Sequence, residues 1–425
     1  LREFAEEETN LPLSLYVHLP FCSSLCYFCA CNKIISQDSS VTGPYLKLVE
    51  KELQLYHQTL SATANSIPPL VQLHWGGGTP NFLSPQQMVE LSELTAKYFP
   101  TNKEKAEVSV ELDPRVCTPE HLDALKSVGF NRVSFGVQDF TEHVQRVVNR
   151  IQPFEQTAEL CNAVRKRGFS SINIDLIYGL PGQTRDGFAR TVKQVIELRP
   201  ERIALYGYAH VTWIQKVQRA LEREHLPTPE ERITLFIDAL TQLSSAGYIY
   251  VGLDHFALPE DELAKATTNK TLRRNFMGYS THRGSRILGI GVSSISTLNG
   301  AFSQNTKDMD QYRKAVEEGS FPTERGCVRT RDDLIRGEVI ELLMCQGRLD
   351  VKAFEKTHAI DFWQYFAGIS TELAGFVDDG LLSLSSEEIS LSSLGRVFSR
   401  NVAMCFDSYL KKHVESSKPV FSQAV

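Results

Sequence analysis

The sequence predicts an α/β protein in which a partial (β/α)6 barrel, similar in plan to a TIM barrel, precedes a smaller, mainly helical domain. Strand-like runs recur over the first 250 residues with helical stretches between them. After about residue 320 the pattern changes to mainly helical stretches. Alternation of strand, helix and strand implies parallel βαβ units. Six or more such units in series favour a barrel or a partial barrel over an open doubly wound sheet.

Six apolar or β-branched runs have strand character, and a seventh run is a further candidate. They lie at residues 13–18, 70–75, 108–112, 132–137, 172–177 and 203–208, with the seventh at 248–253. The first helical stretch has one apolar face, formed by Tyr45, Val49, Leu53, Tyr56 and Leu60. Glycine at positions 129, 168 and 247 separates a helical stretch from a strand and is expected to end the helix in the left-handed conformation.

Polar residues stand at the C-terminal ends of several predicted strands. Glu111, Gln138 and Asp175 lie at or near the ends of three strands, and the turn at 76–79 follows another. In a parallel barrel these ends form the active-site face. Capping of the following helices is the alternative, but glycine turns and acids aligned on one edge favour a site.

Three regions are expected: an N-terminal remnant at 1–12, a barrel at 13–320 and a C-terminal domain at 321–425 with winged-helix-like features. Residues 330–333 are expected to begin a helix. Its predicted buried face consists of Leu334, Val339, Ile340 and Leu343. A winged-helix-like shape does not imply DNA binding, because fold does not specify function.

The composition limits the class of protein. The chain has 425 residues, 42% hydrophobic and 23% charged, with a net charge of −6. Nucleic-acid-binding proteins usually carry a basic stripe, and none is seen. No apolar run approaches the ~18 residues of a transmembrane helix, and nothing reads as a secretory signal. We therefore expect a cytoplasmic, monomeric protein without a nucleic-acid or membrane partner.

Four of the nine cysteines, Cys22, Cys26, Cys29 and Cys31, fall within ten residues. A disulfide framework would spread paired cysteines through a small secreted chain, so this group predicts metal ligation in a reducing compartment. The first three form a C-x3-C-x2-C motif directly after the first strand, with Phe28 before the last cysteine. Structural zinc is the alternative, but zinc prefers four ligands, often as two C-x2-C pairs.

Three thiolates would hold a [4Fe–4S] cluster and leave one iron without a protein ligand. The amino and carboxylate groups of S-adenosylmethionine (SAM) can chelate that iron. An electron from the reduced cluster then cleaves the sulfonium bond and frees a 5′-deoxyadenosyl radical. The motif therefore predicts a radical SAM barrel with its cluster on Cys22, Cys26 and Cys29. Glycine turns at 76–78 and 289–291 would let the backbone approach SAM, although each alone is a weak signal.

Ordered motifs continue along nearly the whole chain, from about residue 13 to about residue 409. They include YVHLPFC at 16–22, CYFCACNK at 26–33, HWGGGTP at 74–80, ELDPR at 111–115, SFGVQDF at 134–140, NIDLIYGLPGQT at 173–184, LDHFALPEDELA at 253–264, RNFMGYST at 274–281, GIGVSSIS at 289–296 and MCFDSYL at 404–410. Together they resemble the oxygen-independent coproporphyrinogen III oxidases (dehydrogenases) of haem biosynthesis. Cys31, two residues after the last cysteine of the motif, distinguishes this family from its relatives.

The resemblance implies two SAM molecules bound side by side. The residues at the family's contact positions for the cluster-bound SAM are Tyr16, Gly77, Glu111 and Ile295. Those for the second SAM are Phe28, Gly78, Thr79, Gln138, Arg150, Asp175 and Ala209. Arg150 can pair with a carboxylate and Asp175 with ribose hydroxyls; the alternatives are a barrel-bottom salt bridge and a helix cap. No catalytic residue is assigned, and His18 fits a core histidine as well as a relay.

The resemblance also implies the reaction. The radical removes a β-hydrogen from a propionate of coproporphyrinogen III, and loss of CO2 and an electron leaves a vinyl group. Two propionates react, giving protoporphyrinogen IX, with a low-potential electron donor and an unidentified electron acceptor. The alternatives are a haem-binding chaperone related to the family, a radical SAM enzyme acting on another tetrapyrrole, and a structural metal domain without catalysis.

Two features depart from the family pattern. The family usually carries a longer segment before the first strand, and the residues found there do not match it. His210 is followed by Val211, Thr212 and Trp213, where the family more often has Leu-Pro. Both departures concern substrate contacts more than SAM contacts.

Overall fold

The computed structural model describes residues 12–62, 67–102, 105–282, 284–298 and 300–410. Contacts group the chain into two compact units, Leu1–Ala246 with His282–Val328, and Gly247–Thr281 with Arg329–Val425. The expected domain limits, 13–320 and 321–425, stay predictions, and the structure groups residues 247–281 with the C-terminal segment. The expected N-terminal remnant lies almost wholly outside the described residues.

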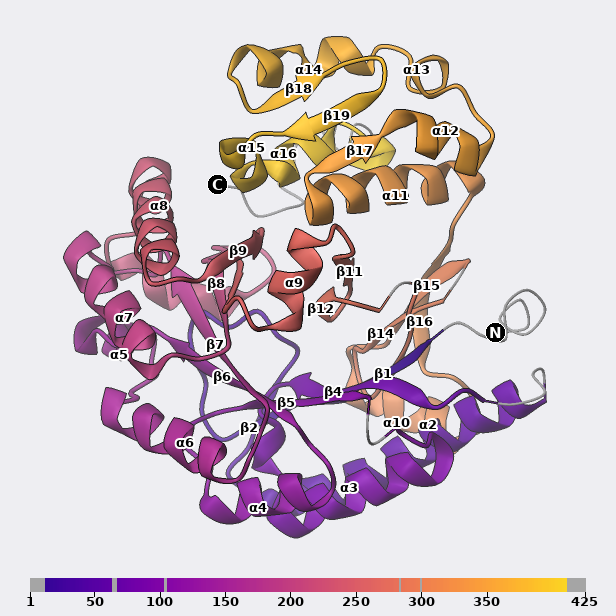
Figure 1. The fold of residues 1–425 in the computed structure, drawn as a ribbon. Coiled ribbons are helices and arrows are strands. Elements are labelled where there is room, and N and C mark those ends of the chain that lie inside the picture. Colours follow the sequence, from indigo (N-terminus) through magenta and orange to yellow (C-terminus); the bar gives the residue numbers. More distant parts are fainter. Residues whose placement is uncertain (1–11, 63–66, 103–104, 283, 299, 411–425) are drawn as a thin grey trace. The chain divides into compact units, whose positions relative to one another are not determined.

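The first unit is built on a twisted, open sheet (Figure 1). Its central strands are mutually parallel and run in chain order: β1 (Leu13–Leu19), β4 (Leu70–Gly77), β5 (Glu107–Leu112), β6 (Arg132–Gln138), β7 (Ser171–Tyr178) and β8 (Arg202–Gly207). These are the six predicted strands. The sheet does not close among the described residues, so the prediction of a partial (β/α)6 barrel is confirmed.

The sheet extends beyond β1 in a way that was not predicted. β13 (Arg286–Ile290) pairs with β1 in parallel. The antiparallel strands β14 (Ile295–Thr297), β15 (Ala301–Asn305) and β16 (Thr323–Val328) follow it. β1 therefore has parallel neighbours on both sides.

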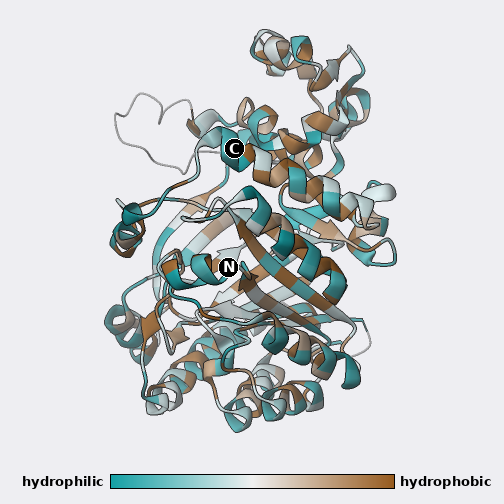
Figure 2. Ribbon diagram, turned by 90° about the vertical axis from the view of Figure 1, so that its left-hand side faces the viewer, coloured by the Kyte–Doolittle hydropathy of each residue, from teal (hydrophilic) through white to brown (hydrophobic). Residues whose placement is uncertain are grey.

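Helices cover the outer face of this sheet (Figure 1). They include α2 (Thr42–Ser61), α3 (Pro85–Tyr98), α4 (Pro119–Ser127), α5 (Glu142–Val147), α6 (Phe154–Lys166), α7 (Arg185–Leu198), α8 (Pro229–Ser245) and α10 (Met309–Glu317). The predicted apolar face of α2 is buried throughout, from Tyr45 to Leu60. In Figure 2 the strands carry apolar stretches, while the helices alternate between apolar and polar residues. Apolar contact between sheet and helices thus forms the core of this unit.

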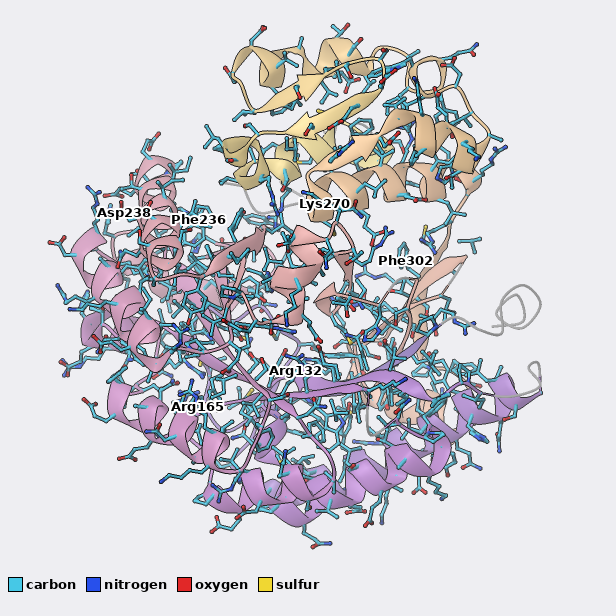
Figure 3. The ribbon with its side chains drawn as sticks, in the orientation of Figure 1. Arg132, Arg165, Phe236, Asp238, Lys270 and Phe302 are labelled. Carbon is cyan, nitrogen blue, oxygen red and sulfur yellow. The ribbon has the colours of Figure 1, made fainter. Side chains whose placement is uncertain are left out.

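Polar side chains also join neighbouring outer helices, and two of them, Arg165 and Asp238, are labelled in Figure 3. Arg165 on α6 donates to the carbonyl oxygens of Leu198 and Arg199, 2.8 Å away in each case, at the end of α7. At the other end of α7, Arg185 donates to Asp238 on α8. The first pair of bonds satisfies carbonyl groups that a helix terminus leaves without an internal partner.

Side chains alternate in burial along the central barrel strands β5 and β6. In β5 and β6, apolar residues at every second position are buried, and polar residues between them are less buried. The polar set on the opposite face includes Ser109, Glu111, Ser134, Asn173 and Asp175, and its members bond across the strands. The sheet thus has an apolar outer face and a polar inner face, as the two-residue period of a strand requires.

The helix ends follow the glycine prediction. Gly129, Gly168 and Gly247 have φ values of 97°, 71° and 91° and follow α4, α6 and α8. L-residues with a side chain rarely adopt this conformation, so glycine ends each helix without steric cost. Among the described residues, no helix combines the length and apolar character needed to cross a bilayer.

The second unit is mainly helical, as predicted. It contains α9 (Glu262–Thr268), α11 (Arg331–Gln346), α12 (Val351–His358), α13 (Phe362–Tyr365), α14 (Ile369–Asp378), α15 (Ser393–Val397) and α16 (Ser399–Met404). A small antiparallel sheet has the order β17 (Arg348–Asp350), β19 (Glu388–Leu391), β18 (Leu382–Leu384). The seventh strand candidate is β9 (Ile249–Gly252), which forms an antiparallel hairpin with β10 (His255–Ala257). β11 (Arg273–Asn275) pairs with β12 (Gly278–Ser280).

Helix α11 begins as predicted, and of its predicted buried face Val339 and Leu343 are buried and Ile340 is partly buried. Thr330 and Asp333 form a capping box at its N-terminus. Leu334 was wrongly placed in the buried face: it is 42% exposed, whereas Ile335 is 1% exposed. Ile335, Val339 and Leu343 are spaced by four residues and therefore share one side of the helix.

The core of the second unit yields a stability prediction. Phe362 is fully buried among Phe354, Phe366 and Phe406. We expect Phe362→Ala to lower the free energy of unfolding of this unit by about 3–5 kcal/mol, because buried area is lost and a cavity remains. Amide hydrogen exchange over the second unit measures this change. Val377→Ala, at an exposed position, should change it by less than about 0.5 kcal/mol. Equal exchange in the two variants would contradict this packing.

Candidate iron–sulfur and SAM site

The cysteine loop leaves the C-terminal end of β1 and is closed at its base. β2 (Phe21–Cys22) and β3 (Ile34–Ile35) pair in parallel across the loop. The Cys29 N–H donates to the Cys26 carbonyl at 3.2 Å, and the Tyr27 N–H donates to the Val148 carbonyl at 3.0 Å. Residues 22–35 therefore form a defined loop at the polar edge of the sheet.

Each predicted ligand thiol has hydrogen-bond donors or positive charge beside it. The Thr79 hydroxyl donates to the sulfur of Cys22 at 3.3 Å. Arg115 and Arg150 each donate to the sulfur of Cys26 at 3.6 Å. The pKa of Cys29 is lowered, chiefly by the hydrogen bond with Cys31 and further by the charges of Lys33 and Arg150.

Donors of this kind favour the thiolate form that iron–sulfur clusters require, although at Cys22 burial outweighs the Thr79 bond and raises the pKa of the thiol to about 11. Among the described residues, no three His, Cys, Asp or Glu side chains are placed to hold a single metal ion. A [4Fe–4S] cube is ligated differently, because each thiolate binds a separate iron at a corner of the cube. The chemistry and surroundings of the three thiols fit such a cluster.

Arg115 belongs to this site and was not identified from the sequence. The Asp113 carboxylate accepts from Arg115 at 2.6 Å and from Arg150 at 3.2 Å. Asp113 is buried, which alone would raise its pKa, but Arg150 and Arg115 hold that pKa below its usual value. A buried ionised carboxylate thus fixes two guanidinium groups beside Cys26. The ELDPR motif was the available signal, but only its glutamate was selected.

The glycine turn after β4 lies against the start of the cysteine loop. The Gly78 N–H donates to the Leu19 carbonyl at 2.8 Å. A Cβ atom on Gly78 would lie 2.6 Å from the Pro20 oxygen, and one on Gly77 would lie 2.6 Å from the His18 ring. Only glycine permits these approaches, so both positions are explained by close packing as well as by ligand access.

His18 is a satisfied core histidine. It is 6% exposed, and its Nε2 donates to the Asn32 carbonyl at 3.0 Å. Because that carbonyl only accepts, Nδ1 of the neutral ring accepts from the Tyr16 hydroxyl at 3.0 Å. Burial lowers the pKa of His18, which favours this neutral form. The imidazole therefore orients Tyr16 and supports Gly77.

Glu111 and Asp175 carry the negative charge of the inner face. Although burial opposes ionisation, His74 and the Gly77 N–H keep the pKa of Glu111 below its usual value. Burial raises the pKa of Asp175 to about 7, and the charge of Glu111 adds to that rise. Asp175 accepts from Asn173 and Ser134 within the sheet, so it is not the helix cap considered as an alternative.

Gln138 and Arg150 leave buried polar atoms without protein partners. Gln138 Oε1 and Arg150 Nε make no hydrogen bond to any described residue. Gln138 also has a φ of 70°, a left-handed conformation that costs a residue with a side chain roughly 1–3 kcal/mol. Such strain persists at ligand sites. Arg150 is ion-paired, but at the C-terminal edge of the strands, beside Cys26, and not at the barrel bottom.

The remaining predicted SAM residues lie on the same edge. Tyr16 stacks on His74 with ring centroids 5.8 Å apart. Gln218 donates to the carbonyls of Phe28 and Ala209, at 2.9 and 3.1 Å, and so joins the cysteine loop to the segment after β8. Ile295 begins β14, directly after the turn that follows β13. The predicted site residues thus lie in the C-terminal half of the parallel strands or in the segments that follow those strands.

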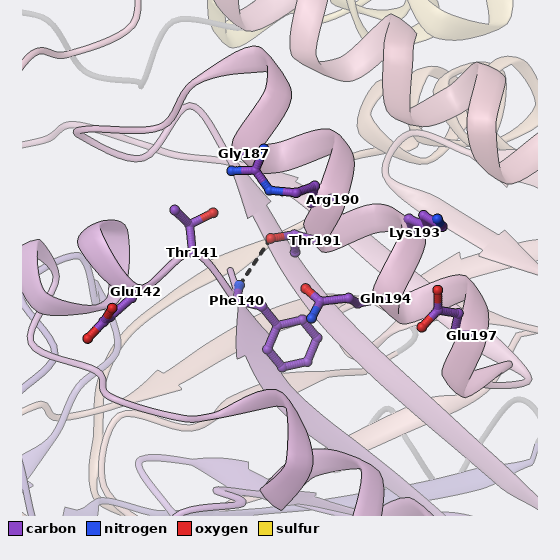
Figure 4. A pocket seen from close by; sticks show the side chains of 9 residues that line it. All are labelled: Phe140, Thr141, Glu142, Gly187, Arg190, Thr191, Lys193, Gln194 and Glu197. Carbon is purple, nitrogen blue, oxygen red and sulfur yellow. Dashed lines mark hydrogen bonds between the residues drawn. The ribbon is translucent and has the colours of Figure 1, made fainter.

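A separate pocket of about 460 Å³ lies on the outer side of the unit (Figure 4). Its lining comes from the segment after β6, from α5 and from α7, and includes Phe140, Glu142, Arg190 and Lys193. The Phe140 N–H donates to the Thr191 hydroxyl at 3.1 Å across its floor. None of the predicted site residues lines this pocket.

The arrangement of cysteine loop, glycine turn and inner-face acids on a partial barrel is that of radical SAM enzymes. The sequence pattern of the Radical SAM superfamily matches residues 16–195, and that of the HemN C-terminal domain matches residues 330–398.

The family within that superfamily follows from full-length relatives. Oxygen-independent coproporphyrinogen III oxidases from Escherichia coli and Pseudomonas aeruginosa are 44% and 43% identical, each over 94% of this chain and 86% of the relative. The Synechocystis protein of that name is 40% identical over 97% and 88%. The solved Escherichia coli coproporphyrinogen III oxidase (HemN), described as a radical SAM enzyme, matches with a TM-score of 0.92 at 42% identity, covering 96% of this chain and 93% of that one. The chain belongs to the oxygen-independent coproporphyrinogen III oxidase family.

Gly78 provides a test of the close packing at the site. In Gly78→Ala the added methyl group would meet backbone atoms of Pro20 and Phe21, which cannot rotate away. We expect reconstituted iron content or SAM affinity to fall about tenfold or more, because the turn must move from the cysteine loop. Gly43→Ala, whose Cβ meets nothing within 4 Å, should leave both unchanged. Normal iron content and SAM affinity in Gly78→Ala would contradict the packing.

Arg115 provides a test of the electrostatics. We expect Arg115→Met to lower the midpoint potential of the reconstituted cluster by on the order of tens of mV, because a positive charge beside Cys26 favours the reduced state. A redox titration followed by electron paramagnetic resonance measures the potential. Arg167→Met removes a guanidinium that pairs with Asp123 on the outer surface and serves as the control. Equal potentials in the two variants would rule out an electrostatic role for Arg115.

Proposed function

We propose that this chain catalyses the anaerobic oxidative decarboxylation of two propionate side chains of coproporphyrinogen III, giving protoporphyrinogen IX. The observation that carries the proposal is similarity of at least 40% identity to named coproporphyrinogen III oxidases over nearly the whole chain. The chemistry of the site is consistent with this proposal. Three thiols with adjacent cations lie on a partial barrel, beside the strained residue Gln138 and the unpaired Nε atom of Arg150.

Cys22, Cys26 and Cys29 hold the [4Fe–4S] cluster in this proposal, and two SAM molecules bind beside it. When bound, the cluster and SAM supply the 5′-deoxyadenosyl radical that removes hydrogen from the substrate. Arg115, Arg150 and Thr79 offset the negative charge of the thiolates. The protein thus contributes binding, orientation and electrostatics, while the cofactors carry the bond-breaking chemistry.

The SAM contacts divide between two groups of residues. Tyr16, Gly77, Glu111 and Ile295 contact the cluster-bound SAM in this proposal. Glu111, held ionised by His74, is suited to a cationic ammonium group or a ribose hydroxyl. Phe28, Gly78, Thr79, Gln138, Arg150, Asp175 and Ala209 contact the second SAM. There Gln138 Oε1 and Arg150 Nε, both unpaired in the described protein, gain partners.

Each turnover at one propionate balances as follows. A hydrogen atom leaves the β-carbon for the deoxyadenosyl radical, the carboxylate leaves as CO2, and one electron passes to an acceptor. The two side-chain carbons that remain form the vinyl group. A low-potential donor supplies the cluster with electrons, and the acceptor is a separate molecule. The inner face must exclude water and oxygen while the carbon radical exists.

We further propose that the protein works as a monomer in the cytoplasm. All nine cysteines are free, and a reducing compartment keeps thiols in that state. The alternatives are not favoured: a haem-binding chaperone leaves the strained Gln138 and the unpaired Arg150 atom without a role, and a structural metal domain leaves the inner-face acids without one.

The proposal is tested by an anaerobic assay of the reconstituted protein with SAM, a low-potential reductant and coproporphyrinogen III. We expect protoporphyrinogen IX with two molecules of 5′-deoxyadenosine per product, because two hydrogen atoms are removed. Cys22→Ser, Cys26→Ser and Cys29→Ser should each lose iron and both products, whereas Cys327→Ser, at an exposed position on β16, should keep them. Deoxyadenosine without porphyrin product would overturn the substrate assignment, and haem bound to purified protein would favour the chaperone.

A further inference from the structure

A carboxylate with no role in the proposed reaction lies beneath the site. Glu52 is on α2, and its side chain is completely buried between the helix and the sheet. A buried carboxylate is costly unless it is hydrogen-bonded, so its partners indicate what it serves. The Gly291 N–H, the Tyr312 hydroxyl and the Asn305 amide each donate to it at 2.7 Å.

Two of those partners concern the turn between β13 and β14, at residues 291–294: Gly291 lies in it and Asn305 bonds to it, while Tyr312 reaches Glu52 from α10. Asn305 Nδ2 also donates to the Gly291 carbonyl at 2.9 Å and to the Ser294 hydroxyl at 3.0 Å. Glu52 therefore binds one end of the turn directly and orients the Asn305 side chain that binds the rest. Every polar group in this set is buried.

The turn itself is strained and needs such support. Gly291 and Ser293 have φ values of 99° and 64°, and the latter is unfavourable for a residue with a side chain. The Ser293 N–H donates to the Thr306 carbonyl at 2.8 Å. A short segment with two left-handed residues keeps one conformation only when surrounding bonds determine it.

Tyr45 connects the same network to the end of β1. Its hydroxyl donates to the His18 carbonyl at 2.7 Å and accepts from the Val292 N–H at 3.2 Å. A Cβ on Gly291 would lie 2.5 Å from that hydroxyl. The turn is therefore packed against both α2 and the last residues before the cysteine loop.

We propose that Glu52 is a positioning residue for SAM: through Asn305 and the Gly291 N–H it fixes the 291–294 turn, and thereby Ile295, against the cluster-bound SAM, while Tyr312 holds the carboxylate in place. The proposal rests on the proposed function, since that function places Ile295 in contact with SAM. Glu52 touches neither cluster nor SAM. Its role is to supply an acceptor-only group where three donors meet.

The protonation state of Glu52 gives a second readout. Burial raises its pKa to about 7, although its three donors favour the charged form. The titratable groups facing it are Tyr45, Tyr56 and Tyr312, whose pKa values burial raises, so they stay neutral. As pH falls through about 7, the protonated carboxyl places an O–H among three donors. SAM affinity should therefore fall at low pH in the wild type.

The experiment measures the SAM dissociation constant of the cluster-loaded full chain between pH 6 and pH 8.5, together with iron content and Tm. In Glu52→Gln an amide NH2 faces a donor. We expect the dissociation constant to rise at least about tenfold at high pH, with iron content unchanged. The fall in SAM affinity at low pH should shrink to the part that Asp175, whose pKa is also about 7, contributes. Tyr312→Phe, which removes one donor, should raise it less.

The matched control is Asn131→Ala at the opposite end of the barrel. The Asn131 side chain accepts from the Val108 N–H at 3.0 Å and donates to the Ala106 carbonyl at 2.8 Å. Loss of these bonds should lower Tm without changing the 291–294 turn. SAM affinity there should stay within about twofold of wild type.

The outcomes separate the two proposals. Wild-type affinity and pH dependence in both Glu52→Gln and Tyr312→Phe would overturn the role of Glu52 alone. If Glu52→Gln does not fold, Tyr312→Phe decides by the same criterion. Failure of the cluster-loaded wild type to bind SAM would overturn the proposed function and this inference together.

Discussion

The site depends on the parallel pairing of β1 with β4 on one side and β13 on the other. Val17 lies opposite both Trp75 and Ile290, so the three strands end at nearly the same level. Because parallel strands share a direction, the chain leaves all three at one edge of the sheet. The cysteine loop, the glycine turn and the 291–294 turn therefore meet, although 22 and 291 are far apart in sequence.

Charge is arranged in two layers around this edge. Cations and hydroxyl donors gather at the thiols, with Asp113 holding Arg115 and Arg150 in place. Carboxylates line the inner face further along the sheet, where Glu111 stays ionised and Asp175 has a raised pKa. A negatively charged cluster and a SAM molecule bearing both signs of charge require such a division. Gln138 Oε1 and Arg150 Nε, which make no hydrogen bond to any described residue, lie at this edge.

Hydrophobic periodicity correctly predicted most helices and strands that bury one face. The six barrel strands, the apolar face of α2 and the helix-ending glycines were predicted because burial imposes a two- or 3.6-residue period. One residue of the buried face of α11 was misplaced, since Leu334 and Ile335 are adjacent and equally apolar. The β13–β16 extension was missed because β13 is a run of only five residues and the antiparallel strands β14, β15 and β16 carry few apolar residues in alternation.

The sequence by itself determined the chemistry: three cysteines at fixed spacing, glycine turns and strand-end acids specify thiolate ligation and a polar edge. Family motifs added the SAM positions. Tertiary structure alone decided that Arg115 lies beside Cys26 and that Glu52 supports a turn 239 residues away. Nothing local distinguishes an arginine or a glutamate that is buried from one on the surface. Only the folded chain shows which charges lose water and must therefore find partners.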